Sequence, residues 1–257
     1  MASWMPRTVA TLALAASGAL TFAAAYERWW PACPHGDLDA SACVRLQSHE
    51  FDYLVPTTPW QPIGQDAEYA GLALLALALA ALVLPFVLRP ATPPGPWRIF
   101  AVVLAVVPAG ALAVLGVATL RAGLTGEPTS VPAVIGPAVL VWAVAWPAAL
   151  TAYAVLAPGR TGRPRAVAVA VLLALSTPVP VLLLLGPIAA GYTSYDTVPW
   201  TEATAAPLLL VAALLVGWPA RLRRPSLVSV RPTPSPGSPG GPRRPFGRSG
   251  GVGSAHP

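Results

Sequence analysis

Side chains that could do chemistry are concentrated in one polar segment, residues 26–68. This segment holds both cysteines of the chain, two of the three histidines and seven of the ten acidic residues. Thiols, imidazoles and carboxylates act as nucleophiles, acid–base groups and metal ligands. A reaction centre or a metal site would therefore be sought here first.

Cys33 and Cys43 allow two interpretations. The first is a disulfide that closes a short loop and stabilises it by about 3 kcal/mol through the entropy of the unfolded chain. The second is a metal site that adds His35, Asp37 and Asp39 to the two thiolates. Soft and hard ligands are mixed in this set and the CxxC spacing of structural zinc sites is missing, so we predict the disulfide and no metal.

His49, Glu50 and Asp52 form a second polar cluster, within the sequence His-Glu-Phe-Asp-Tyr. Catalysis by these groups would need a nucleophile and an organised pocket, and the neighbouring sequence supplies neither, so we interpret the cluster as a solvated loop. The chain has no Walker A loop, no HExxH, no GxSxG, no dinucleotide fingerprint and no CxxCH haem attachment. We therefore predict a protein that is not an enzyme and binds no cofactor.

The elements around this segment are strongly apolar. Of the 257 residues, 55% are hydrophobic and 10% are charged, against about 25% charged in soluble domains; the mean hydropathy is +0.62. A helix needs roughly 20 apolar residues to cross a bilayer. Six stretches without a charged residue or histidine reach or approach this length: Val9–Ala25, Tyr69–Leu88, Ile99–Leu120, Val131–Ala157, Ala166–Ala190 and Ala205–Ala220.

These stretches predict an all-α fold, a polytopic membrane bundle of about six transmembrane helices. The domains expected are 1–25, an N-terminal span or signal anchor; 26–68, an extracytoplasmic loop; 69–220, five further spans; and 221–257, a cytoplasmic tail. The first stretch also fits a signal peptide, with Arg7 before the apolar core and Ala23–Ala25 as a cleavage site. Cleavage would leave five spans and an extracytoplasmic N-terminus.

The arginines set the orientation. Residues 1–8, 89–98, 158–165 and 221–257 hold thirteen of the sixteen arginines and no acidic residue. Residues 26–68, 121–130 and 191–204 hold three arginines and all ten acidic residues. Because cytoplasmic segments carry the arginine excess, we predict a cell-membrane protein with cytoplasmic termini. Tryptophans near the span ends are expected to form interfacial belts, with Trp29, Trp30, Trp60 and Trp200 outside and Trp4, Trp97 and Trp218 inside.

Two places within the spans are candidates for a substrate or a packing face. Trp142 and Trp146 lie one helical turn apart, deeper than a belt would place them. Ser176, Thr177, Pro178 and Pro180 lie near the middle of the fifth stretch, where the prolines remove backbone donors and bend or break the helix. Interrupted helices line binding sites in transporters, but neighbouring hydroxyls also satisfy purely structural kinks.

The tail from residue 221 is rich in Pro, Gly, Ser and Arg and is predicted to be disordered. Arg221, Arg223 and Arg224 begin it, and we expect them to attract anionic inner-leaflet lipids by about 1 kcal/mol each. The arginines form no basic face on a soluble domain, so nucleic acid is not an expected partner.

Two functions remain. The first is a multi-pass membrane protein that is not an enzyme and whose extracytoplasmic loop binds a partner protein or a lipid. The alternative is a permease, or a permease subunit, for a neutral or lipidic substrate.

Overall fold

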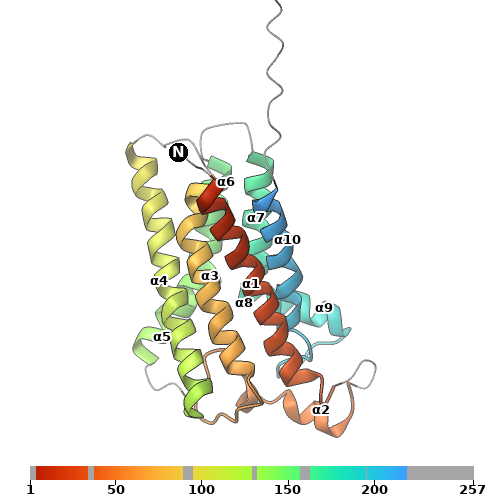
Figure 1. Ribbon diagram of the computed structural model, residues 1–257. Helices are drawn as coiled ribbons and strands as arrows, with labels where there is room; N and C mark the ends of the chain where they lie inside the picture. The colour runs from red at the N-terminus through yellow and green to blue at the C-terminus, as the bar shows by residue number, and fades with distance from the viewer. Residues whose placement is uncertain are drawn as a thin grey trace, which may run out of the picture. The chain divides into compact units, whose positions relative to one another are not determined.

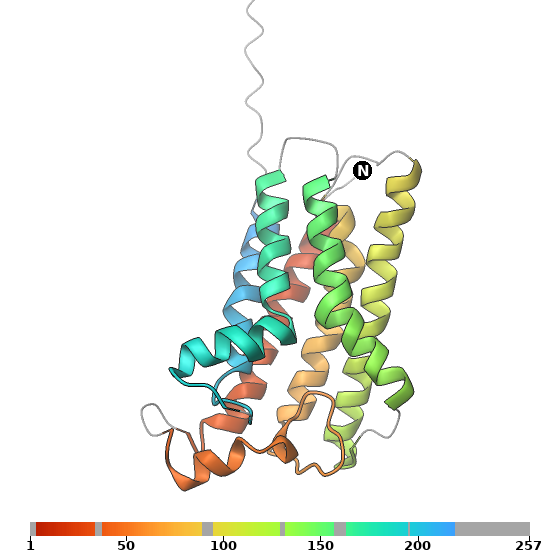
Figure 2. The same cartoon turned by 180° about the vertical axis from the view of Figure 1, so that it is seen from behind.

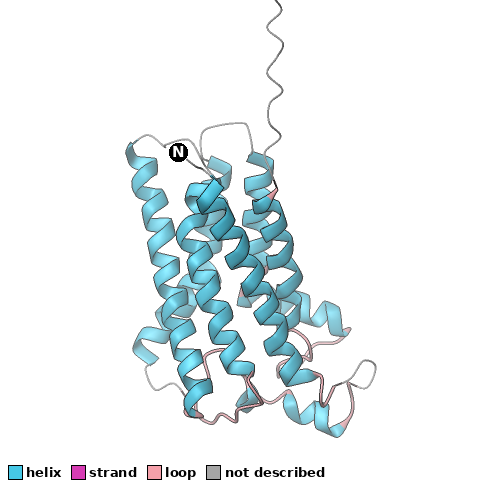
Figure 3. Ribbon diagram, in the orientation of Figure 1, coloured by secondary structure: helices cyan, strands magenta, loops and turns pink. Residues whose placement is uncertain are grey.

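The computed structural model describes residues 4–33, 38–88, 95–128, 132–156, 163–194 and 196–218. Every regular element in these ranges is helical, and they contain no strand (Figure 3). The prediction of an all-α chain is therefore confirmed. The predicted tail, with Arg221, Arg223 and Arg224, lies outside the described residues.

Four helices form the side of the bundle that faces the viewer in Figure 1: α1 (Trp4–Trp29), α3 (Asp66–Leu88), α4 (Gly95–Thr125) and α10 (Ala205–Gly217). Helix α3 packs against both α1 and α4, and α10 packs against the other side of α1. We call these four helices the regular half, because each is a single α-helix with no π-helical turn in it.

Small residues allow close packing between α3 and α4. A Cβ atom added to Gly71 would lie 2.5 Å from the backbone nitrogen of Leu120, and one added to Gly116 would lie 3.0 Å from the carbonyl oxygen of Gly71. Close approach of the two backbones increases the van der Waals contact between the helices. The glycines therefore fix the spacing of these two helices.

The remaining helices form what we call the irregular half. Here α5 (Pro132–Leu140) continues through the π-helical turn η2 (Val141–Ala145) into α6 (Trp146–Leu156). Helix α7 (Arg163–Leu175) is followed by α8 (Pro178–Pro180), the π-helical turn η3 (Val181–Leu185) and α9 (Gly186–Ala190). The segment from Pro178 to Ala190 is bent by 61° from α7, and Figure 2 shows it turning sideways from that helix.

Each π-helical turn ends two residues before a proline. The N–H of Trp146, which precedes Pro147, donates to the carbonyl of Val141, and the N–H of Gly186, which precedes Pro187, donates to the carbonyl of Val181. In a regular α-helix the proline ring collides with the carbonyl four residues earlier. The wider turn, with bonds five residues apart, moves that carbonyl away.

Four helices are long and apolar enough to cross a membrane: Trp4–Trp29, Asp66–Leu88, Gly95–Thr125 and Ala133–Leu156. The bent pair Arg163–Leu175 and Pro178–Ala190 adds a fifth if it counts as one span, and the last apolar helix, Glu202–Gly217, is shorter. These apolar helices are compatible with a multi-pass membrane protein. The predicted number of six is not reached by this criterion and stays a prediction.

Candidate functional site

The polar segment between α1 and α3 folds over one end of the helices. It contains α2 (Ser41–Leu46) and the 3-10 turn η1 (His49–Phe51), and Figures 1 and 2 both place it at the end of the bundle where α9 lies. We call residues 30–33 and 38–65 the cap. A disulfide joins Cys33 and Cys43, whose Cα atoms are 4.9 Å apart, and both are fully buried.

The predicted disulfide is therefore confirmed, and it takes both sulfur ligands from the alternative metal site. His35 and Asp37, which that site would also need, lie outside the described residues. Within the described ranges no group of three or more His, Cys, Asp and Glu residues could hold a metal ion.

Arg28, at the end of α1, is fully buried and lies at the centre of a charged cluster. Its Nη1 donates to Asp52 Oδ1 at 2.8 Å and to Glu202 Oε1 at 2.9 Å, and its Nη2 donates to the carbonyl of Leu46 at 2.8 Å. The indole Nε1 of Trp29 donates to the other oxygen of Glu202, Oε2, at 2.9 Å. One guanidinium thus joins α1, the cap and η4 (Glu202–Thr204), the 3-10 turn before α10.

Further contacts extend this cluster to the surface. Thr197 Oγ1 donates to Asp52 Oδ1 at 2.8 Å, and Nδ1 of the exposed His49 lies 2.8 Å from Asp52 Oδ2. The guanidinium carbon of Arg28 lies 4.4 Å from the ring centroid of Trp29, within the range of a cation–π contact. Both carboxylates are therefore occupied by donors, which repays part of the cost of burying the charges.

Two expectations from the sequence are wrong here. Asp52 is not part of a freely solvated loop, because it pairs with the buried Arg28. Trp29 is not part of an interfacial belt, because its side chain is fully buried against the cap and bonded to Glu202. The hydrophobic effect and the buried carboxylate outweigh the preference of tryptophan for an interface at this position.

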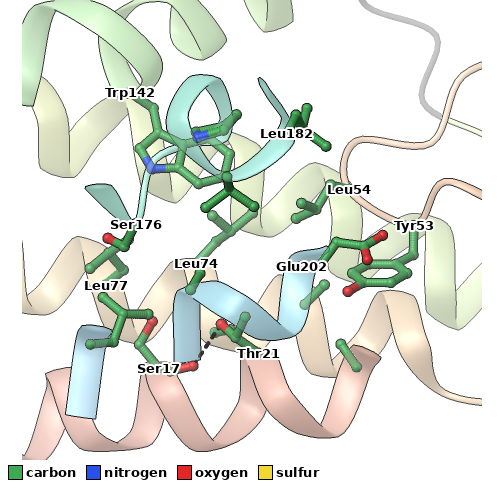
Figure 4. A pocket seen from close by; sticks show the side chains of 17 residues that line it. Ser17, Thr21, Tyr53, Leu54, Leu74, Leu77, Trp142, Ser176, Leu182 and Glu202 are labelled. Carbon is green, nitrogen blue, oxygen red and sulfur yellow. Dashed lines mark hydrogen bonds between the residues drawn. The ribbon is translucent and has the colours of Figure 1, made fainter. Parts of the chain in front are cut away.

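An apolar cavity of about 70 Å³ lies beside this cluster (Figure 4). Both halves of the bundle line it, the regular half with residues such as Ser17 and Leu74 and the irregular half with Trp142 and Pro178. The cap contributes Tyr53 and Leu54. The cavity is thus completed by the segment that contains both cysteines.

A second cavity, of about 360 Å³, shares six lining residues with the first. These are Tyr53, Leu54, Trp142, Pro178, Leu182 and Glu202. It extends to the exposed residues His49, Ser194 and Asp196 at the surface. The inner cavity is therefore reached from the cap end through a wider space with a polar rim.

Two buried donors in the inner cavity lack a partner. The hydroxyl of Tyr53, a residue 2% exposed, and the indole N–H of Trp142, 7% exposed, have no hydrogen-bond partner within the described part of the chain. Burial, with the nearby Glu202 carboxylate, raises the pKa of Tyr53 well above its usual value, so the phenol stays protonated. By contrast, Thr21 Oγ1 donates to the carbonyl of Ser17 at 2.8 Å, and Ser176 Oγ donates to that of Leu173 at 2.9 Å.

The structure divides the residues singled out in the spans into two groups. Trp142, Ser176 and Pro178 line the inner cavity, because the π-helical turn η2 packs against α8. Trp146, Thr177 and Pro180 do not line it. Trp146 is buried, and Thr177 Oγ1 donates to the carbonyl of Ala174 at 2.7 Å, which satisfies an acceptor at the end of α7.

The charged cluster was missed by the sequence interpretation. Arg28 and Glu202 were counted only for orientation, although they flank the first and the last apolar stretch on the same predicted side of the membrane. Opposite charges placed in this way were the available signal for a pair. Nothing in the sequence pattern pointed to Tyr53.

Comparison with known proteins provides no relative for this chain: no protein-family model matches it, and neither a curated protein nor a solved structure does.

Proposed function

We propose that this chain is a multi-pass membrane protein that is not an enzyme and that binds a lipidic ligand in the capped cavity. The observation that carries the proposal is the apolar cavity between the helices, completed by Tyr53 and Leu54 of the cap and joined to a wider space with a polar rim. Ligand sites are commonly concave and apolar, with a few placed polar groups.

The cluster beside the cavity supports binding in preference to catalysis. Both oxygens of Glu202 accept hydrogen bonds, from Arg28 and Trp29, and both oxygens of Asp52 also have close partners. A carboxylate whose two oxygens already have partners within the protein is not placed to contact a substrate. In this proposal, Glu202 and Asp52 hold the cap on the helix ends.

The orientation in the membrane belongs to the same proposal. Thirteen arginines in the segments assigned to the cytoplasm and ten acidic residues in the others support an extracytoplasmic cap. The ligand would then enter from the outer leaflet. Anionic lipids of the inner leaflet would contact Arg221, Arg223 and Arg224. Only the charge pattern of the sequence supports this contact.

A permease for a neutral or lipidic substrate is the second candidate. Its support is the break in the fifth apolar stretch, since Ser176 and Pro178 lie at the break and line the cavity. If the protein moves the ligand, proteoliposomes containing it should transfer a labelled lipid between leaflets faster than empty vesicles. A Pro178→Ala, Pro180→Ala variant should lose that rate while still binding lipid.

Native mass spectrometry of protein released from lipid nanodiscs tests the binding function. Wild-type protein should retain bound lipid, and Ala73→Leu, which fills the inner cavity at a buried position on α3, should retain much less. The matched control is Ala148→Leu, at an exposed position on α6. Equal retention by wild type and both variants would place the lipid elsewhere and contradict the proposal.

A further inference from the structure

We infer that the capped cavity selects an uncharged lipid whose apolar chain carries two hydrogen-bond acceptor oxygens, one bound by the hydroxyl of Tyr53 and the other by the indole N–H of Trp142. This inference rests on the proposed function, because it names the chemical class of the ligand for the same cavity. Figure 4 shows the two side chains at opposite ends of the cavity lining, Tyr53 beside Glu202 and Trp142 near Ser176.

Both donors are buried and form no hydrogen bond with any group in the described part of the chain. Buried polar groups in proteins are nearly always hydrogen-bonded, and one that is not calls for an explanation. An indole nitrogen can only donate, so Trp142 requires an acceptor. A phenol can donate or accept, and Tyr53 stays protonated and can donate.

Three polar side chains that line the cavity already have partners elsewhere: Glu202, Thr21 and Ser176. The two oxygens of Glu202 accept from Arg28 and Trp29. The hydroxyls of Thr21 and Ser176 donate to the carbonyls of Ser17 and Leu173. Neither hydroxyl accepts a hydrogen bond from Tyr53 or Trp142. Oxygens of a bound lipid would supply the acceptors that this lining does not.

The cavity lining disfavours a charged ligand. An anionic ligand would be desolvated among apolar side chains and repelled by the Glu202 carboxylate at one end of the cavity. A cationic ammonium group offers no acceptor to Trp142. A neutral carbonyl, ester or ether oxygen meets both conditions at the smallest desolvation cost.

Apolar side chains continue from the inner cavity into the outer one. The two cavities share Leu54 and Leu182, and the outer one adds Val139 and Leu183. An apolar chain attached to the acceptors can therefore continue from the inner cavity toward the cap end. A free polar molecule would leave these side chains without a partner.

Photolabelling of the full-length protein in nanodiscs tests the inference. The probes are diazirine lipids of equal chain length that carry no polar group, two ketone groups, a carboxylate or an ammonium group. The ketone probe should label cavity peptides more strongly than the hydrocarbon probe does, by roughly 5-fold for each hydrogen bond formed. The two charged probes should label them less than the ketone.

Variants identify the donors. Tyr53→Phe and Trp142→Phe should each reduce the preference for the ketone by roughly 5-fold, with unchanged labelling by the hydrocarbon. The control for Trp142→Phe is Trp146→Phe, which removes another buried, unpartnered indole N–H that does not line the cavity. The control for Tyr53→Phe is Tyr69→Phe, because the hydroxyl of Tyr69 donates to Gln65 at an exposed site.

The outcomes separate this inference from the proposed function. Equal labelling by ketone and hydrocarbon would mean that water serves the donors, and it would overturn the inference while lipid binding stands. Strongest labelling by the carboxylate or the ammonium probe would overturn the selection for an uncharged group. No labelling of cavity peptides by any probe would overturn both proposals.

Discussion

The regular and irregular halves of the bundle are both built from apolar helices, but these helices differ in how they pack. In the regular half, Gly71 and Gly116 bring α3 and α4 into backbone contact. In the irregular half, two π-helical turns and a 61° bend displace side chains from regular helical positions. The cavity lies between the halves, so the straight helices supply one wall and the interrupted helices create the space.

Proline number alone does not explain this difference. Pro85 and Pro108 lie inside α3 and α4, which remain α-helical around them. Pro147 and Pro187 follow π-helical turns, and Pro178 follows a residue with extended backbone, Thr177 at φ −81° and ψ 160°. An extended conformation is favoured for a residue before proline, and the hydroxyls of Ser176 and Thr177 stabilise the end of α7 at this point.

The largest predicted effect comes from removing the charge that joins α1 to the cap and to η4. Arg28→Met leaves Asp52 and Glu202 without their shared partner in a buried site, which typically costs about 3–5 kcal/mol. The variant should show a much lower unfolding temperature in nanodiscs, and limited proteolysis should cut its cap faster. Arg45→Met, at an exposed position of the cap, is the control. Equal stability of the two variants would show that the cluster does not hold the cap.

A slightly smaller effect is expected in the cap alone. Cys33→Ser removes the disulfide that closes the short loop to Cys43, for a loss of about 3 kcal/mol. Proteolysis of the cap, followed by mass spectrometry, should become as fast in this variant as in reduced wild-type protein. If reduction of the wild type leaves cap proteolysis unchanged, the disulfide is not what orders this segment.

The regular half should be sensitive to a single methyl group. Gly71→Ala places a Cβ against the backbone of Leu120 and should destabilise the protein by about 1–3 kcal/mol through overpacking. Gly110→Ala is the matched control on α4, because its Cβ would meet no atom within 4 Å. It should stabilise the helix by about 0.5–1 kcal/mol. Opposite shifts in unfolding temperature would confirm the contrast, and parallel shifts would contradict it.

The smallest effect is expected at the break itself. Ser176→Ala removes the bond to the carbonyl of Leu173 and should cost about 1 kcal/mol. Thr8→Ala removes a similar bond, to the carbonyl of Trp4, at an exposed position and should change stability by less than about 0.5 kcal/mol. Chemical denaturation of both variants measures the difference. A larger loss at Thr8 would mean that the hydroxyls at the break contribute little to its stability.

The sequence could predict the features that follow from the residue types in each segment. The runs between charged residues located the apolar helices, and the two cysteines, ten residues apart, located the disulfide. It could not predict the pairing of Arg28 with Glu202, which are 174 residues apart, because only tertiary packing brings them together. The role of Tyr53 depends on how the cap folds back, and no local pattern around this residue encodes that path.

The most direct test of the account is a crystal structure of the protein grown from a lipidic phase. The account predicts continuous non-protein density in the inner cavity, with polar atoms of the bound molecule near the hydroxyl of Tyr53 and the indole nitrogen of Trp142. A cavity filled by ordered water alone, or closed by movement of the cap, would contradict it.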